Sequence, residues 1–156
     1  MLSQFAMPAK APLLQHIKDK KSEATIRAAL NDYIAESGDI NAVCNDNDET
    51  ILSFACRENY LEIIKILLDQ QADLLKVDKG SHSCLMRVMS AEACQLIITA
   101  AAQKNCLQQL FNLRNADAAG PMSAMDMACM NGKPDVLNLL LEYAVFDDIK
   151  RMVDSN

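Results

Sequence analysis

Residues 50–73 read TILSFACRENYLEIIKILLDQQAD and hold two apolar runs separated by a short polar turn. The runs cover residues 51–56 and 61–68, and the turn lies at residues 58–60. This spacing predicts a short helix followed by a longer one, and the apolar residues of the longer helix are too widely spread to form one narrow stripe. We therefore expect that helix to be covered on two sides, by its short partner and by a neighbouring helix pair.

The same pattern recurs along the chain. TILSFAC (50–56) aligns with SCLMRVM (83–89) and SAMDMAC (123–129), and the offsets are 33 and 40 residues. The second run recurs in the same register as LIITAA (96–101) and VLNLLL (136–141). A helix pair that returns at a nearly fixed period predicts a solenoid of stacked units, each in contact with its neighbours.

The repeated unit resembles the ankyrin repeat, whose pattern is T-P-L-H-x-A-x-x-x-G-x-x-x-I-V-x-L-L-L-x-x-G-A-D. NGKPDVLNLLL (131–141) strengthens the resemblance, because Gly132 falls at the turn and Pro134 at the start of the second helix. The resemblance implies an all-α ankyrin-repeat solenoid of helix-turn-helix units with hairpin-like loops, about four units in all, including an incomplete N-terminal one. In a single domain, 1–156, the units are expected at approximately 10–43, 44–77, 78–115 and 116–146, with a C-terminal cap at 147–156.

Several features depart from a regular stack. Gln71 replaces the usual glycine after the second helix of its unit. The unit that follows has no Asn or Gly between its helices, which predicts a short first helix and makes Ser90 the expected N-cap of the next. A similarly short helix is found in ankyrin-type inhibitors of cyclin-dependent kinases.

Seven extra residues near QKNCLQQLFNLRN (103–115) predict a lengthened helix or an extra helical turn. Ile149, Met152 and Val153 have helical spacing, which is consistent with a cap that hides the open end of the stack and equally with the first part of a longer chain.

Charge and cysteine content favour certain partners and compartments. The net charge is −6, and residues 1–30 carry +3, so the remaining residues carry −9 and should repel nucleic acid and anionic membranes while attracting a basic protein surface. Six cysteines without a C-x-x-C pair predict reduced thiols in the cytoplasm, with Cys56, Cys94 and Cys129 packed as small apolar residues. The chain is also similar to short ankyrin proteins that intracellular bacteria deliver into host cells.

The residues needed for catalysis are scarce. His16 is expected on a helix surface, and His82 precedes Cys84 by two residues. That pair could be a thiolate–imidazole site or half of a zinc site, but a loop histidine beside a packed cysteine is the favoured interpretation. NDNDE (45–49) lacks the spacing of a calcium loop, and the isolated glycines form no phosphate-binding motif. We therefore predict no enzyme activity, no cofactor and no metal.

Function is expected on the concave face formed by loop tips and short helices. Met125 takes a position that is buried in ankyrin repeats, whereas Met130 takes one that faces outward. The predicted function is a monomeric, non-catalytic scaffold that binds another protein; the alternatives are an ankyrin-type inhibitor of a kinase or other enzyme, and a hydrolase that uses Cys84 with His82. The predicted partner-binding residues are Asp46, Asn47, Asp48, Glu49, Arg57, Glu58, Lys79, His82, Arg87, Ser90, Met122, Met130 and Asn131.

Overall fold

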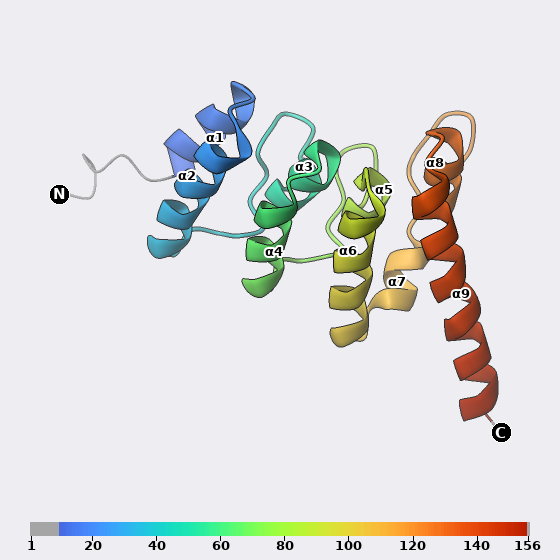
Figure 1. Ribbon diagram of the computed structural model, residues 1–156. Helices are drawn as coiled ribbons and strands as arrows, with labels where there is room; N and C mark the ends of the chain where they lie inside the picture. Colours follow the sequence, from blue (N-terminus) through green and yellow to red (C-terminus); the bar gives the residue numbers. More distant parts are fainter. Residues whose placement is uncertain (1–9, 156) are drawn as a thin grey trace.

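Helices arranged as successive pairs make up the computed structural model, which describes residues 10–155 (Figure 1). The pairs are α1 (Lys10–Lys18) with α2 (Glu23–Ala35), α3 (Ile51–Glu58) with α4 (Leu61–Asp69), α5 (Cys84–Arg87) with α6 (Ala91–Gln103), and α8 (Ala124–Met130) with α9 (Pro134–Asp154). One further helix, α7 (Leu107–Asn112), lies between the third and fourth pairs. The predicted all-α solenoid is confirmed. None of the described helices is long and apolar enough to cross a bilayer.

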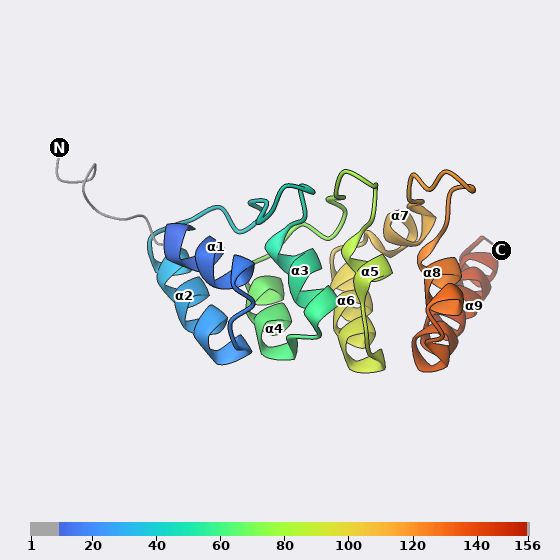
Figure 2. The same ribbon diagram turned by 90° about the horizontal axis from the view of Figure 1, so that it is seen from above.

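The helices form two layers. Figure 2 shows α1, α3, α5 and α8 in one layer and α2, α4, α6 and α9 behind them. Each second-layer helix packs against the next, α2 on α4, α4 on α6 and α6 on α9, and in the first layer α3 packs on α5 and α5 on α8. Contacts of this kind between neighbouring units are what a repeat stack requires.

Hydroxyl side chains at one repeated position start three of the first-layer helices. Thr50 accepts a hydrogen bond from the Ser53 amide, and Ser83 and Ser123 do the same at α5 and α8. Such N-caps satisfy backbone donors that have no partner inside the helix. The predicted N-cap of α6 is also confirmed, because the Ser90 hydroxyl accepts from the Ala93 amide at 3.2 Å.

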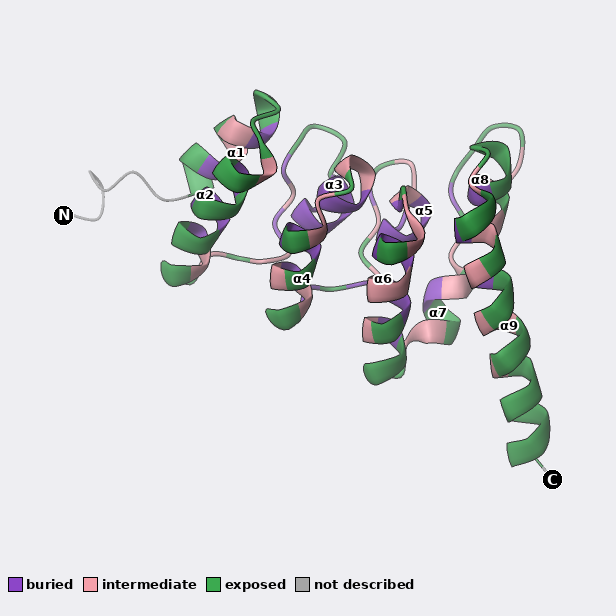
Figure 3. Cartoon of the chain, viewed as in Figure 1, coloured by how far each residue is buried: buried purple, intermediate pink, exposed green. Residues whose placement is uncertain are grey.

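One apolar core runs through the stack between the two layers. Residues 51–56 of α3 are all buried, and Ile63, Ile64 and Leu67 of α4 have no exposed surface. Figure 3 shows the buried residues on the sides of the helices that face their neighbours. The prediction that the longer helix is covered on two sides therefore agrees with the packing of α4 between α2 and α6.

The N-terminal unit has both of its helices, so the prediction of an incomplete unit is wrong for the helix pair. The sequence pattern had indicated only the second helix and the turn after it. The first helix, α1, has a weak apolar pattern in which only Leu13 and Ile17 are buried. Residues 1–9, where a preceding loop would fall, lie outside the described residues.

The third unit is irregular in the two ways predicted. Its first helix, α5, has only four residues, and its second helix, α6, has 13 residues compared with nine in α4. The extra residues also form α7, in which Leu110 is buried. Both a lengthened helix and an additional helical segment are therefore present.

The C-terminal residues continue α9 and do not form a separate cap. Between Pro134 and Asp154 the sequence contains no further Pro and no Gly, so nothing interrupts the helix. Ile149, Met152 and Val153 are 55%, 68% and 67% exposed, which corrects the prediction that they hide the end of the stack.

Left-handed residues end several of the second-layer helices, and this gives a stability prediction. Ser37, Gln71 and Asn105 have φ values of 59°, 61° and 56° and follow α2, α4 and α6. A left-handed conformation costs a non-glycine residue about 1 kcal/mol, and part of the gain from glycine is lost through the greater freedom of the unfolded chain. We expect Gln71→Gly to raise the free energy of unfolding by about 0.5 kcal/mol in urea titrations. Gly132→Ala, at a φ of 63°, is the reverse control and should lower it; a destabilised Gln71→Gly variant would contradict the prediction.

Candidate functional site

One long face of the stack, which we call the front face, consists of the exposed sides of α1, α3, α5 and α8 and of the loops at residues 45–49, 78–82 and 115–122. Figure 2 shows these loops following one another along the same edge of the stack. The front face draws on all four helix pairs, so a ligand lying along it could contact several units at once.

The three loops are closed by equivalent backbone hydrogen bonds. The amides of Cys44, Asp78 and Asn115 donate to the carbonyl oxygens of Glu49, His82 and Met122 at 2.8, 3.1 and 2.9 Å. The prediction of hairpin-like loops agrees with this pattern, although among the described residues extended pairing is limited to one bridge, between Val43 and Thr50.

Side chains and neighbouring loops then fix the loops in place. Asn45 and Asp78 each accept hydrogen bonds from amides of their own loop, and Asn115 accepts one from the Met122 amide at 2.8 Å. The Lys79 amide donates to the Asn47 carbonyl at 2.9 Å, and the Ala116 amide donates to the Gly80 carbonyl at 2.8 Å. The loop tips are thus presented as a connected row.

Glu49 and Arg57 form a structural ion pair in the second unit. Arg57 donates from Nε and Nη2 to the two carboxylate oxygens of Glu49 at 3.1 and 3.0 Å, and Glu49 is only 3% exposed. The hydrogen bond to Glu49 raises the pKa of Arg57, and the guanidinium also lies over the Phe54 ring. The prediction that Glu49 contacts a partner is therefore wrong, because its carboxylate is buried and holds Arg57.

Asp78 is the centre of a second polar network. It accepts from Arg87 Nη2 at 2.7 Å, and its other oxygen lies 3.1 Å from His82 Nδ1. Asn115 Nδ2 lies 3.4 Å from His82 Nε2, which links loop 78–82 to loop 115–122. Burial raises the pKa of Asp78, but the hydrogen bonds from Arg87 and His82 outweigh this effect and hold it below its ordinary value.

The network assigns structural roles to two predicted partner-binding residues, His82 and Arg87. A Cβ atom at Gly80 would lie 2.7 Å from the His82 ring, so the absence of a side chain at Gly80 lets the imidazole reach Asp78. Sequence spacing could not reveal this arrangement, because it depends on how the loop folds back toward α5.

The proposed pairing of Cys84 with His82 is not formed. Cys84 is 2% exposed, and its thiol donates to the Leu74 carbonyl, whereas both ring nitrogens of His82 face other residues. A hydrogen bond with Cys84, together with burial, raises the pKa of Cys56 well above its ordinary value, and burial raises that of Cys94 to about 12. The favoured interpretation, a loop histidine beside a packed cysteine, is confirmed.

Cys129 and Met125 lie on α8 and differ in how far they are buried. Cys129 is exposed, so the prediction that it packs in the core is wrong: its position on α8 faces away from α9 and the core. Met125 is partly buried against the core, in agreement with its repeat position. Within residues 10–155 no group of three or more His, Cys, Asp or Glu side chains could hold a metal ion.

A hollow on the front face lies between the first and second units. Its volume is about 420 Å³, and its lining includes Lys18 and Lys20 from the first unit and Asp46, Arg57 and Glu58 from the second. It is open and carries charges of both signs. The contribution of Lys18 and Lys20 was missed in the sequence, because the first helix of that unit was not recognised as part of the front layer.

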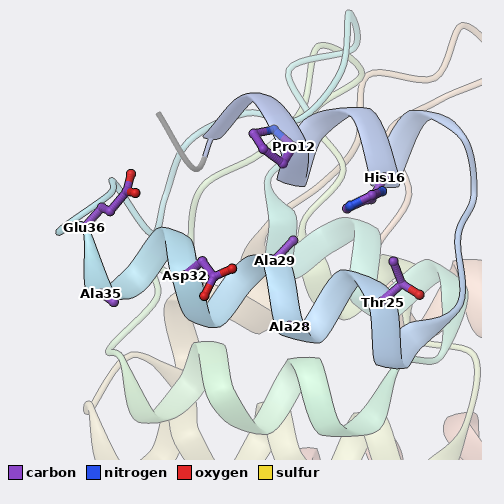
Figure 4. Close-up of a pocket in the computed structure, with 8 residues that line it drawn as sticks. All are labelled: Pro12, His16, Thr25, Ala28, Ala29, Asp32, Ala35 and Glu36. Carbon is purple, nitrogen blue, oxygen red and sulfur yellow. The ribbon is translucent and has the colours of Figure 1, made fainter. Parts of the chain in front are cut away.

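A second hollow, of about 720 Å³, lies at the N-terminal end of the stack, away from the front face (Figure 4). It is bounded by α1 and α2, and Figure 4 shows His16 above the small side chains of Ala28 and Ala29. His16 is half-buried, and its Nδ1 atom is buried without a hydrogen-bond partner, which corrects the prediction of a plain surface position. The hollow adds no residue to the front face.

Comparison with known protein families finds a match for one of the helix pairs and its loops. Residues 47–79 match the family model of the ankyrin repeat, and this segment contains α3, α4 and the tips of two loops. The chain therefore contains an ankyrin repeat. No curated protein matches the chain. The matched segment includes the departure at Gln71, and the short first helix and the seven extra residues lie in the unit that follows it.

The predicted contact residues fall into two groups. Those in structural contacts are Glu49, Arg57, Glu58, His82, Arg87 and Ser90; Arg57 donates to Glu58 at 2.8 Å, and the Ser90 hydroxyl also donates to Asn59. Those available on the surface are Asp46, Asn47, Asp48, Lys79, Met130 and Asn131, with Met122 half-buried. Met89, which is 47% exposed, belongs with them but was missed, because it lies in the irregular link between α5 and α6.

Proposed function

We propose that the front face binds another protein, as ankyrin repeats generally do. The observation that supports this most is the exposure of Met130, which is 68% exposed at the C-terminal end of α8, on the same face as loops that are held in place by hydrogen bonds. An apolar side chain on a pre-ordered surface can bind without a large ordering cost. The chain acts as a scaffold in this proposal, with no catalytic step.

The chemistry of the face indicates the kind of partner. Met89 and Met130 supply an adaptable apolar contact. Asp46, Asp48 and Asp117 lie exposed on the loops, with Lys79 as the nearby positive charge, so the loop tips carry a net negative charge. This arrangement fits a protein segment with basic residues along the loops and an apolar residue near α8.

The cytoplasm is the compartment we propose. Cys44, Cys56, Cys84 and Cys94 are buried as free thiols, and packing of this kind suits a reducing environment. Delivery into a host cell stays a prediction from the resemblance alone.

The test is partner capture from cell lysate followed by titration of the captured protein. Met130→Glu should weaken binding at least about tenfold, because it places a charge in the apolar contact. Asp46→Lys should slow association and reduce its salt dependence. Met152→Glu is the matched control, since Met152 has the same 68% exposure but lies on α9, away from the front face. Equal affinity for the Met130→Glu variant and the wild type would refute the assignment of the face.

Inhibition of a kinase is a second candidate, favoured by the four-residue α5. A similarly short first helix is found in ankyrin-type inhibitors of cyclin-dependent kinases, so this candidate rests on the resemblance of one unit. Adding the protein to a kinase panel distinguishes the two functions, because a scaffold leaves turnover unchanged. Inhibition that is lost in the Met130→Glu variant would place the inhibitory contact on the same face.

A further inference from the structure

The outer side of α9 carries a continuous apolar surface, which we call the α9 stripe. It consists of Leu141, Val145, Phe146, Ile149, Met152 and Val153, which are 45%, 55%, 67%, 55%, 68% and 67% exposed. At 3.6 residues per turn these positions share one side of the helix, nearly opposite the buried Val136 and Leu140. Most of the stripe therefore points away from the stack, although Phe146 also borders a hollow shared with Gln95 of α6. Figure 3 shows the last turns of α9 exposed.

The α9 stripe extends beyond the rest of the molecule. Helix α9 has 21 residues and its neighbour α6 has 13, so the C-terminal turns of α9 continue past the end of α6 (Figure 1). The stripe runs over about 18 Å of helix, at a rise of about 1.5 Å per residue. A second helix can approach along this length without meeting the chain's own helices.

The exposed apolar area is large enough for a specific contact. With roughly 150–200 Å² for each fully exposed side chain of this size, the six residues offer about 600 Å² per copy, against about 800 Å² per partner in a typical interface that includes a polar rim. Outside the stripe, the exposed large apolar side chains of the described residues are Met89 and Met130. The surface in this molecule that best matches the α9 stripe is therefore the same stripe on another copy.

In place of the monomer expected from the sequence, we propose that two copies of the chain form a symmetric dimer by packing their α9 stripes against each other in antiparallel orientation. A symmetric contact of one surface with itself is the commonest form of homo-oligomer. The two stripes overlap along their whole length when residue 147 of one copy lies opposite residue 147 of the other. In that register Val145 lies against Ile149 of the second copy, and the two Phe146 rings lie beside the twofold axis.

The charges beside the stripe fit the same register. Glu142 of one copy and Lys150 of the second copy lie on the same flank, about two residues apart along the helix axis, within reach of an ion pair that symmetry repeats. The nearest like charges are the two Asp148 side chains, and each is paired with Arg151 of its own helix. Because each stripe points away from its own stack, the two stacks lie on opposite sides of the helix pair in this arrangement.

Sedimentation equilibrium of the full chain between about 1 and 100 µM tests the proposal, a range suited to an interface of this modest area. The expected result is a reversible monomer–dimer equilibrium. Ile149→Glu and Met152→Glu should each weaken dimerisation at least about tenfold by placing a charge in the apolar contact. Both should keep the far-ultraviolet spectrum and thermal midpoint of the wild-type monomer, since both side chains are exposed in the single chain. Met130→Glu, with the same exposure as Met152, should leave the equilibrium unchanged.

A charge exchange tests the register. Glu142→Lys or Lys150→Glu alone should weaken the dimer about 3- to 10-fold, because each breaks the same ion pair twice, and the double exchange should restore it. A chain that stays monomeric at 100 µM, a dimer that survives Ile149→Glu, or a double exchange weaker than either single variant would overturn the proposal. Binding of the monomeric chain to anionic liposomes that is lost on Met152→Glu would instead assign the stripe to a lipid surface and would also overturn it.

Discussion

Replacing Leu67 by alanine is expected to lower the free energy of unfolding by about 2 to 5 kcal/mol. Leu67 has no exposed surface and lies in the middle of α4, the helix that packs between α2 and α6. Alanine would remove buried apolar atoms and leave a cavity that a close-packed stack can only partly fill. Urea unfolding followed by circular dichroism gives the measurement.

Two leucines next to each other in α9 provide the control. Leu140 has no exposed surface, and Leu141 is 45% exposed. Leu140→Ala should show a loss similar to that of Leu67→Ala, whereas Leu141→Ala should change the free energy of unfolding by less than about 0.5 kcal/mol when measured on dilute protein. A Leu67→Ala variant as stable as the wild type would mean that α4 is not covered on both sides.

The repeat architecture was readable from the sequence because its determinants are local. Thr50, Ser83 and Ser123 recur at one position of the pattern, and in the structure each caps a first-layer helix. Ser90 and the short α5 were predicted in the same way, from residues within one turn of the feature they control. One sequence is enough to show such signals, because the residue at which a helix starts is determined by residues next to it in the chain.

The end of the stack was not readable in this way. Ile149, Met152 and Val153 have the spacing of a helix with one apolar side, and that spacing is the same whether the side is buried in the chain or exposed on it. The outcome depends on whether another helix packs on that side, and α6 and α8, which pack on α9, lie on its other sides. Burial is a property of the assembled stack, so the pattern alone left it undetermined.

The candidate site was predicted as a face but only partly as residues. Asp46, Asn47, Asp48 and Met130 are exposed as expected, because loop tips and the outward position of the repeat are defined by the pattern. Glu49 was misassigned because its partner Arg57 is eight residues away and comes within 3.0 Å only after the loop closes. Ion pairs of this kind are formed by tertiary geometry, which a sequence pattern does not contain.

Removing the carboxylate of Asp78 is the second change with a large expected effect. Asp78→Ala should lower the free energy of unfolding by about 3 to 5 kcal/mol, since a partly buried arginine loses its ion-pair partner. The loop amides of Gly80 and His82 also lose the oxygen that accepts their hydrogen bonds. Asp78→Asn should cost less, because its side-chain oxygen can still accept from these amides while the charge is lost.

The pH dependence of this loss provides the stricter test. The pKa of Asp78 is lower in the folded chain than in the unfolded one, so its contribution to stability is present above the unfolded pKa and is lost as the pH falls through the folded value. The difference in free energy of unfolding between wild type and Asp78→Asn should therefore be present at pH 7 and pH 5 and should shrink below about pH 4. Urea midpoints for both proteins at pH 7, 5 and 3 supply the comparison. A difference that stays the same at acidic pH would mean that the negative charge of Asp78 does not stabilise the loop. The hydrogen bonds to its carboxylate would then contribute no more than hydrogen bonds to a neutral side chain.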